Sequence, residues 1–95
     1  MITSKQRAAL RGMANGLETI VQIGKAGIGD NIITQADDAL TARELIKLRV
    51  LETCPVSARD AAREIAARVS AEIVQVIGTR FVLYRRRAKD PKIVV

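Results

Sequence analysis

The first residues of the chain place apolar side chains at the spacing of an amphipathic helix. Four of them recur at i, i+3, i+4 and i+7 and predict a buried helix face: Leu10, Met13, Ala14 and Leu17. Thr3, with Gln6 three positions later, has the pattern of a capping box, so the helix is expected to begin there. Arg7 and Arg11 would lie on the opposite, polar side of this helix.

Two further segments have a helical period. Apolar residues four positions apart form a stripe that predicts a second helix: Ile28, Ile32, Ala36 and Leu40. Asp30 falls in its first turn, where the helix dipole favours an acidic side chain. Pro55 interrupts the chain before a third helix, for which Ser57 is placed to cap and which is expected to end near Ser70.

Four segments are rich in β-branched residues and predict strands: residues 19–24, 45–51, 72–78 and 80–86. In the second segment apolar residues alternate with Lys47 and Arg49, so one strand face is expected to point into a core. Glycine first in the two-residue loop Gly78-Thr79 suits a type II′ hairpin between the last two strands. The order is therefore α-β-α-β-α-β-β, an α/β chain of the α+β type with helices packed on one sheet.

The positive charge of the chain is concentrated at its C-terminal end. Sixteen Lys and Arg residues against ten Asp and Glu give the 95 residues a net charge of +6, of which residues 80–95 carry +5. We expect one domain over residues 1–87, followed by a basic and apolar tail over residues 88–95 that is mobile or ordered by a partner. A concentrated basic segment favours a polyanionic partner, nucleic acid first and an acidic membrane surface second.

The composition argues against several other classes of protein. No apolar run approaches the roughly 18 to 20 residues that span a bilayer, and no signal peptide is visible, so we expect a cytoplasmic protein without a membrane partner. Cys54 is the only cysteine and histidine is absent, which argues against a disulfide or a zinc site. No nucleophile–base pair stands out, so we expect neither catalysis nor a cofactor. We also expect a monomer.

The segment Gly24-Lys25-Ala26-Gly27 joins the first predicted strand to the second predicted helix. Two glycines let the backbone turn tightly and approach another molecule without interference from Cβ atoms. The free N–H groups of the following helix start would attract an anion, and Lys25 adds a full charge. The segment is neither a Walker A loop nor a dinucleotide-binding fingerprint, and alone it is also typical of a plain turn. KH-type modules use the same short loop to clamp a nucleic-acid backbone.

Basic residues elsewhere in the chain could extend such a contact. They lie on the second strand, on the first helix and near the C-terminus: Lys47, Arg49, Arg7, Arg11, Arg85 and Arg86. Each set alone could be an ordinary solvated surface, but together they favour a track for a polyanion. Tyr84 lies among the C-terminal arginines and could stack on a base, but a tyrosine in an edge strand more often serves packing.

Four motifs in order resemble those of a known family. They are KQR…LR…A in the first predicted helix, VQIGKAG at the glycine loop, ALTARELIKLRVL before the second strand's end, and VQVIGTRFVLYRR through the hairpin. Together they cover residues 1 to about 87 and resemble the YhbY family, the bacterial stand-alone form of the CRM (chloroplast RNA splicing and ribosome maturation) domain. The resemblance implies a four-stranded mixed sheet with three helices, similar to the C-terminal domain of bacterial translation initiation factor three.

The resemblance also implies a function and the residues that carry it. It implies RNA binding, and the stand-alone bacterial members are associated with precursors of the large ribosomal subunit. The family's RNA-contacting loop corresponds here to four residues: Gly24, Lys25, Ala26 and Gly27. The ELIK motif places Lys47, with Arg49 nearby, and the LYR motif places Tyr84 and Arg85.

Two positions depart from the family pattern near the glycine loop. Glu18-Thr19 stands where the family often has a basic residue and a proline, and Ala26 stands where an asparagine is common. Each departure is expected to weaken the polar contact with RNA slightly.

The leading expectation is an RNA-binding protein that contacts ribosomal RNA in precursor large subunits and acts in ribosome assembly without catalysis. A protein-interaction module that docks on a ribosomal protein is one alternative. A nonspecific nucleic-acid binder is another.

Overall fold

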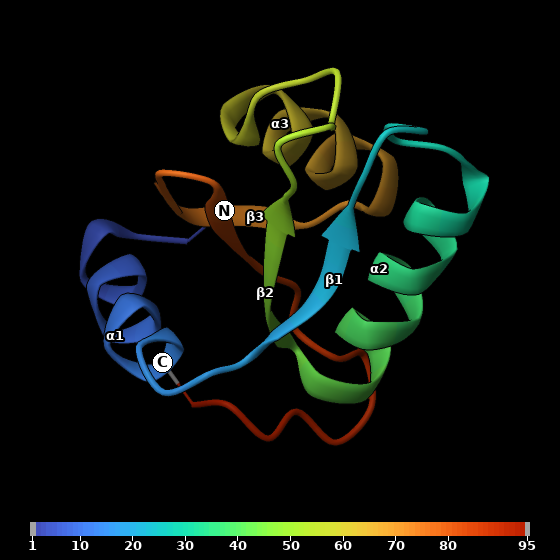
Figure 1. Ribbon diagram of the computed structural model, residues 1–95. Coiled ribbons are helices and arrows are strands. Elements are labelled where there is room, and N and C mark those ends of the chain that lie inside the picture. The colour runs from blue at the N-terminus through green and yellow to red at the C-terminus, as the bar shows by residue number, and fades with distance from the viewer. Residues whose placement is uncertain (1, 95) are drawn as a thin grey trace.

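Helices and strands alternate along residues 2–94, which the computed structural model describes (Figure 1). Their bounds are α1 (Ser4–Ala14), β1 (Thr19–Ile23), α2 (Asp30–Arg43), β2 (Leu45–Val50), α3 (Ala58–Val69), β3 (Glu72–Ile77) and β4 (Arg80–Tyr84). This is the order expected from the sequence, and the predicted α+β class with three helices and a four-stranded mixed sheet is confirmed.

The strands form one sheet in the order β1-β2-β4-β3. β1 runs parallel to β2, whereas β4 pairs antiparallel with both β2 and β3. The parallel pair needs a crossover connection, which contains α2, while β3 and β4 are joined by the short turn Gly78-Thr79. Gly78 has a φ of 58°, as glycine in the first position of the predicted hairpin turn requires, so the hairpin is confirmed.

Two helix starts are capped as the sequence predicts. At α1 the Thr3 N–H donates to Gln6 Oε1 at 2.8 Å, and the Gln6 N–H donates to Thr3 Oγ1 at 3.1 Å. This is the reciprocal capping box. At α3 the Asp60 N–H donates to Ser57 Oγ at 3.2 Å. Both caps satisfy N–H groups that have no acceptor inside their own helix.

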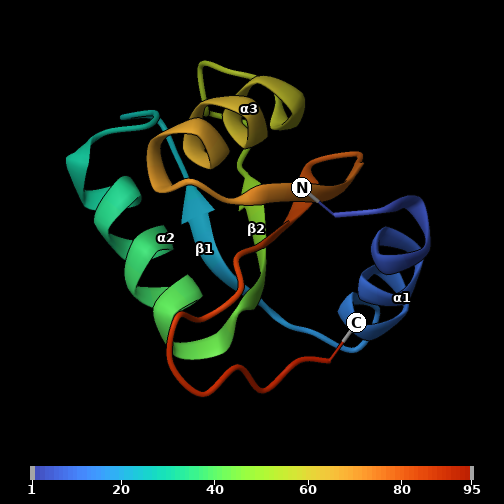
Figure 2. The ribbon, with the colours of Figure 1, turned by 180° about the vertical axis from the view of Figure 1, so that it is seen from behind.

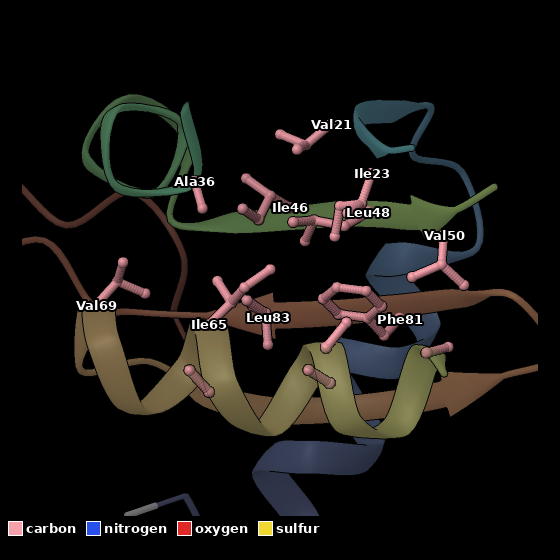
Figure 3. Packing of buried hydrophobic residues seen from close by; sticks show 14 of the residues in the cluster. Val21, Ile23, Ala36, Ile46, Leu48, Val50, Ile65, Val69, Phe81 and Leu83 are labelled. Atoms are coloured by element: carbon pink, nitrogen blue, oxygen red, sulfur yellow. The ribbon is translucent and has the colours of Figure 1, made fainter. Parts of the chain in front are cut away.

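The larger part of the core lies between the sheet and the helices α2 and α3. Alternate residues of β1, β2 and β4 point into it, because side chains along a strand alternate between its two faces. Figure 3 shows Ile46 and Leu48 of β2 together with Ile65 of α3, and Phe81 and Leu83 of β4 beside them. Small side chains on α3 allow it to lie close to the sheet: Ala58, Ala61, Ala62 and Ala66.

Helix α1 covers part of the opposite face of the sheet (Figures 1 and 2). Leu10 and Ala14 pack there against side chains of β2, β3 and β4: Leu45, Val74, Val82 and Tyr84. Met13, expected on the buried face, is 42 % exposed, because the contact stripe of α1 is narrow and centres on Leu10 and Ala14. Leu45 lies on the same face of β2 as Lys47 and Arg49, and α1 buries it there.

The segment after β4, which contains the tail expected from the sequence, lies against the domain. It runs from the end of α2 back to α1 (Figures 1 and 2). Glu44, the residue after α2, is 1 % exposed, and its Oε1 accepts hydrogen bonds from the N–H groups of Lys92 and Ile93. The Ile93 side chain packs against the apolar cluster under α1. The segment is thus tied to both helices.

The structure also bears on membrane spans, metal sites and the single cysteine. Within residues 2–94 no helix combines the length and the apolar character needed to cross a membrane. The same residues contain no gathering of His, Cys, Asp and Glu side chains that could hold a metal ion. Cys54 is a half-buried free thiol.

Candidate nucleic-acid interface

The glycine loop between β1 and α2 is a tight turn that packs against the loop before α3. The Gly27 N–H donates to the Gly24 carbonyl oxygen at 3.0 Å and closes the turn. Gly27 has a φ of 71°, and a Cβ atom there would lie 3.1 Å from Pro55 Cγ, so a larger residue would be strained. A Cβ atom at Gly24 would meet Leu51 Cδ1 at 3.7 Å, an ordinary contact. Gly27 is therefore the structural glycine of the pair.

Lys25 and Ala26 form the exposed tip of this turn. The base of the turn is held by the sheet, because the Leu51 N–H donates to the Ile23 carbonyl oxygen at 2.9 Å, one residue before the loop. The loop that carries Lys25 is thus held by the hydrogen bond from Leu51 to Ile23 and by its own turn hydrogen bond.

The helix behind the loop begins later than predicted. α2 starts at Asp30 with Gly29 as its N-cap, while Ile28 packs against the core from the preceding loop. Gly29 has no side chain to cap the helix, and Asp30 puts a carboxylate in the first turn. The N–H groups of α2 therefore do not follow the glycine loop directly, and Lys25 is the main positive feature of the loop.

Strand pairing brings two arginines to the same end of the sheet as this loop. β1 and β2 are parallel and end together, since Ile23 is paired with Val50. β4 begins at this end, because it is antiparallel to β2 and Arg80 is paired with Arg49. Lys25, two residues after Ile23, therefore lies at the end of the sheet that carries both arginines.

A row of four residues, one from each strand, crosses the sheet near this end. The register pairs Gln22 with Arg49, Arg49 with Arg80, and Arg80 with Ile77; we call these four residues the basic row. The row lies on the face that α1 covers, because Val82, two residues after Arg80, packs under α1. Gln22, Arg80 and Ile77 are nevertheless exposed, Ile77 by 63 %. α1 thus leaves this part of the face open.

Lys47 extends the basic row toward α1. It lies two residues before Arg49 on the same face of β2 and is half-buried. Together with Asn15 and Arg80 it lines a hollow of about 150 Å³ between the end of α1 and the hairpin. Arg49 is also half-buried, and its Nε–H has no hydrogen-bond acceptor among residues 2–94. Both predicted strand cations therefore lie against the sheet surface.

Arg7 and Arg11 lie one helical turn apart on α1. Arg7 is half-buried and Arg11 is exposed. Because α1 packs on the face of the sheet that carries the basic row, the two arginines are on the same side of the molecule as the row.

Arg85, which the sequence predicts in an RNA-binding track, makes several contacts within the fold. Its Nη1 donates to Asp37 Oδ1 at 2.7 Å and to the Val69 carbonyl oxygen at 2.9 Å. Its Nη2 donates to the Asp37 carbonyl oxygen at 3.1 Å and to Thr41 Oγ1 at 2.9 Å. The side chain is 24 % exposed. One guanidinium thereby joins α2, α3 and the end of β4.

Tyr84 is buried, which agrees with packing and not with stacking of its ring on a base. β4 is an inner strand and not an edge strand, and the ring packs under α1 with 6 % exposure. Burial raises the pKa of the Tyr84 hydroxyl above its usual 10.0; the Glu44 carboxylate raises this pKa further, and Arg86 lowers it. Packing, the alternative considered from the sequence, is the role that the structure supports.

Arg86 and Arg87 lie at the other end of the sheet from the glycine loop. Tyr84, just before them, is paired with Leu45 at the start of β2, whereas the loop lies beside the end of β2. Arg86 is exposed and Arg87 is half-buried. The cations expected to form one track therefore lie at two ends of the sheet.

Arg80 is the member of this surface that was not selected from the sequence. The predicted hairpin turn already makes Arg80 the first residue of a strand, on the same face as Val82. What the local pattern does not reveal is that this strand pairs with β2 and puts Arg80 opposite Arg49. The β2–β4 pairing is a long-range contact, and it carries the information that was missing.

Comparisons with known proteins identify the family. Residues 2–85 match the sequence model of the CRS1 / YhbY (CRM) domain. The chain is 41 % identical over 93 residues to the "probable RNA-binding protein YqeI" of Bacillus subtilis, covering 98 % of this chain and 97 % of that protein. It is 33 % identical over 100 residues to the "probable RNA-binding protein MJ0652" of Methanocaldococcus jannaschii, covering 96 % of this chain and 74 % of that protein.

A solved structure agrees with this assignment. The solution structure of the hypothetical protein SAV1595 from Staphylococcus aureus matches with a TM-score of 0.74 at 41 % identity, covering 100 % of this chain and 99 % of that one. Fold, sequence and length thus correspond over the whole domain. The chain belongs to the CRS1 / YhbY (CRM) domain family.

Proposed function

We propose that the protein binds RNA at the glycine-loop end of its sheet, without catalysis. The observation that carries the proposal is a set of cations: Lys25 lies in the loop at this end of the sheet, and Lys47, Arg49 and Arg80 lie on the face that α1 partly covers. None of them forms an ion pair within residues 2–94, so their charge remains available to a polyanion. The relatives named as RNA-binding proteins support RNA as that polyanion.

Recognition would proceed through the RNA backbone and shape. Phe81 and Tyr84 are the only aromatic residues of the chain, and both are buried, so no aromatic ring is available for stacking on bases. Cations that contact phosphates position an RNA without reading its sequence. Affinity should therefore fall steeply as the salt concentration rises.

The family resemblance extends the proposal to a cellular partner. The RNA would be ribosomal RNA in precursors of the large ribosomal subunit, bound by a cytoplasmic monomer that acts in ribosome assembly. Gradient sedimentation of a cell lysate tests this part, because the protein should travel with large-subunit precursors and leave them after RNase treatment. A protein found only in the free fractions would contradict the ribosomal assignment.

The variant Lys25→Glu tests the loop directly. Lys25 is exposed, so the midpoint of thermal unfolding should not change. The affinity for structured RNA, measured by fluorescence anisotropy at moderate salt, should fall by about tenfold, because a phosphate-facing cation becomes an anion. Arg63→Glu is the matched control: it makes the same charge change at an exposed residue of α3, across the sheet. An unchanged affinity of Lys25→Glu would refute the loop assignment.

Two rival functions predict different outcomes in the same assays. A module that docks on a ribosomal protein would stay in its complex after RNase treatment. A nonspecific nucleic-acid binder would be displaced equally by structured RNA and by duplex DNA at equal phosphate concentration.

A further inference from the structure

Two arginines of the basic row face each other directly. Arg49 of β2 and Arg80 of β4 are an antiparallel pair, so their Cβ atoms lie about 5 Å apart on one face of the sheet. Neither side chain forms an ion pair or a hydrogen bond within residues 2–94. Like charges at opposed positions destabilise a sheet. The pair therefore lowers the stability of the free protein without a compensating contact inside it.

Within the sheet, the residues around the pair add positive charge, while Glu18 and Glu52 lie outside the strands, Glu18 beside Lys47 and Glu52 in the turn after β2. Lys47 lies on the same face two residues before Arg49, and it lines a hollow with Arg80. The four strands contain a single acidic residue, Glu72, which is paired with Tyr84 at the far end of the sheet. The buried Nε–H of Arg49 has no acceptor among residues 2–94, although a buried donor without a partner is unfavourable. This Nε–H can therefore donate to an acceptor of a bound anion.

We infer that Arg49 and Arg80 form a clamp for one phosphodiester group of the RNA. A guanidinium group donates hydrogen bonds to phosphate oxygens in a fork, and two opposed forks can hold one phosphate between them. The bound phosphate would turn the repulsion between the two arginines into two attractions, and Lys47 would add a third. Ile77, the exposed end of the row beside Arg80, offers an apolar surface to a neighbouring ribose.

The clamp rests on the proposed binding of RNA but makes separate predictions. Lys25 contributes from an exposed loop, so its replacement tests the RNA-binding surface without touching the arginine pair. Arg80 is exposed at the first position of β4, so Arg80→Gln should fold normally. Because this substitution removes one of the two opposed positive charges, the midpoint of thermal unfolding in chloride buffer should not fall.

The main test measures the affinity for structured RNA at several salt concentrations. Arg80→Gln should bind about five- to tenfold more weakly than the wild type and should lose about one phosphate contact from the salt dependence. Arg49→Lys keeps the charge but loses the fork, so it should also bind more weakly. Arg63→Gln, which removes an exposed arginine of α3, should leave both quantities unchanged. Unchanged affinity and salt dependence in Arg80→Gln would overturn the clamp.

Failure of the clamp and failure of the proposed function can be told apart. If Lys25→Glu weakens RNA binding and Arg80→Gln does not, the clamp is refuted and RNA binding at the loop stands. If the wild type binds no structured RNA, the proposed function fails, and inorganic phosphate then tests the clamp. Phosphate in place of chloride at equal ionic strength should raise the unfolding midpoint of the wild type and not of Arg80→Gln. An equal response of both proteins would refute the clamp.

Discussion

Arg85 contacts Asp37 at two points: Nη1 lies 2.7 Å from Oδ1, and Nη2 lies 3.1 Å from the backbone carbonyl oxygen. The same guanidinium donates to the carbonyl oxygen of Val69, the last residue of α3, where a helix has carbonyl groups without partners. A cation there is also favoured by the helix dipole. The arginine that follows β4 thus joins the C-terminal half of α2 to the end of α3.

The variant Arg85→Ala should therefore destabilise the fold. Removing four hydrogen bonds, one of them to a carboxylate, should lower the free energy of unfolding by about 2 kcal/mol, measured by urea denaturation. Arg86→Ala is the control, because Arg86 is exposed and its replacement should change this free energy by no more than about 0.5 kcal/mol. Equal effects of the two substitutions would show that the contacts of Arg85 contribute little.

The run Arg85 to Arg87 also shows which contacts could not be predicted from the sequence. All three residues look alike along the chain, and only contacts with Asp37, 48 positions away, distinguish Arg85 from the other two. Features that depend on close neighbours in sequence were predictable: the capping box of Thr3 and the hairpin turn at Gly78. Such features need only residues three or four positions apart.

Strand order limited the prediction of the site in the same way. The alternation in each strand defines two faces, but it does not say which strands are neighbours. Tyr84 was assigned to an edge strand, whereas β4 lies between β2 and β3 and its ring is buried. The same pairing puts Arg80 opposite Arg49 and so assembles the basic row from residues that are 31 positions apart in the sequence.

The two loop glycines should respond differently to alanine. Gly27→Ala should lower the free energy of unfolding by more than about 1 kcal/mol, because φ is 71° and the new Cβ would lie 3.1 Å from Pro55 Cγ. Gly24→Ala should leave stability nearly unchanged, so its RNA affinity reports whether the RNA backbone comes close to this residue. Urea denaturation measures the first effect and anisotropy the second. A Gly24→Ala protein that is as unstable as Gly27→Ala would contradict this division of roles.

Tyr84 should make stability depend on alkaline pH. Burial, aided by the charge of Glu44, raises the pKa of the hydroxyl above its usual 10.0. Because the folded pKa exceeds the unfolded one, the stabilisation is complete below about pH 10 and is lost as pH rises through the folded pKa. Tyr84→Phe should remove this part of the pH dependence, so the difference between the two proteins in urea denaturation isolates it from the lysines.

The titration itself can be observed directly. Tyr84 is the only tyrosine of the chain, so the ultraviolet absorbance of tyrosinate reports its pKa without interference from another ring. We expect a midpoint above pH 10.0 in the folded protein. A midpoint at or below this value would show that the ring is not held in the buried position under α1.

Glu44 should control the order of the C-terminal segment. Its Oε1 accepts from the N–H groups of Lys92 and Ile93, the latter at 3.2 Å, so Glu44→Ala should expose both amides to exchange with solvent. Hydrogen exchange followed by NMR should be at least about tenfold faster at these two amides, since a charge-assisted hydrogen bond contributes about 1.5 to 3 kcal/mol. Glu52→Ala, which removes an exposed carboxylate from the turn after β2, is the control and should leave this exchange unchanged. If exchange at Lys92 and Ile93 is as slow in Glu44→Ala as in the wild type, the packing of the Ile93 side chain under α1 holds the segment and the buried carboxylate does not.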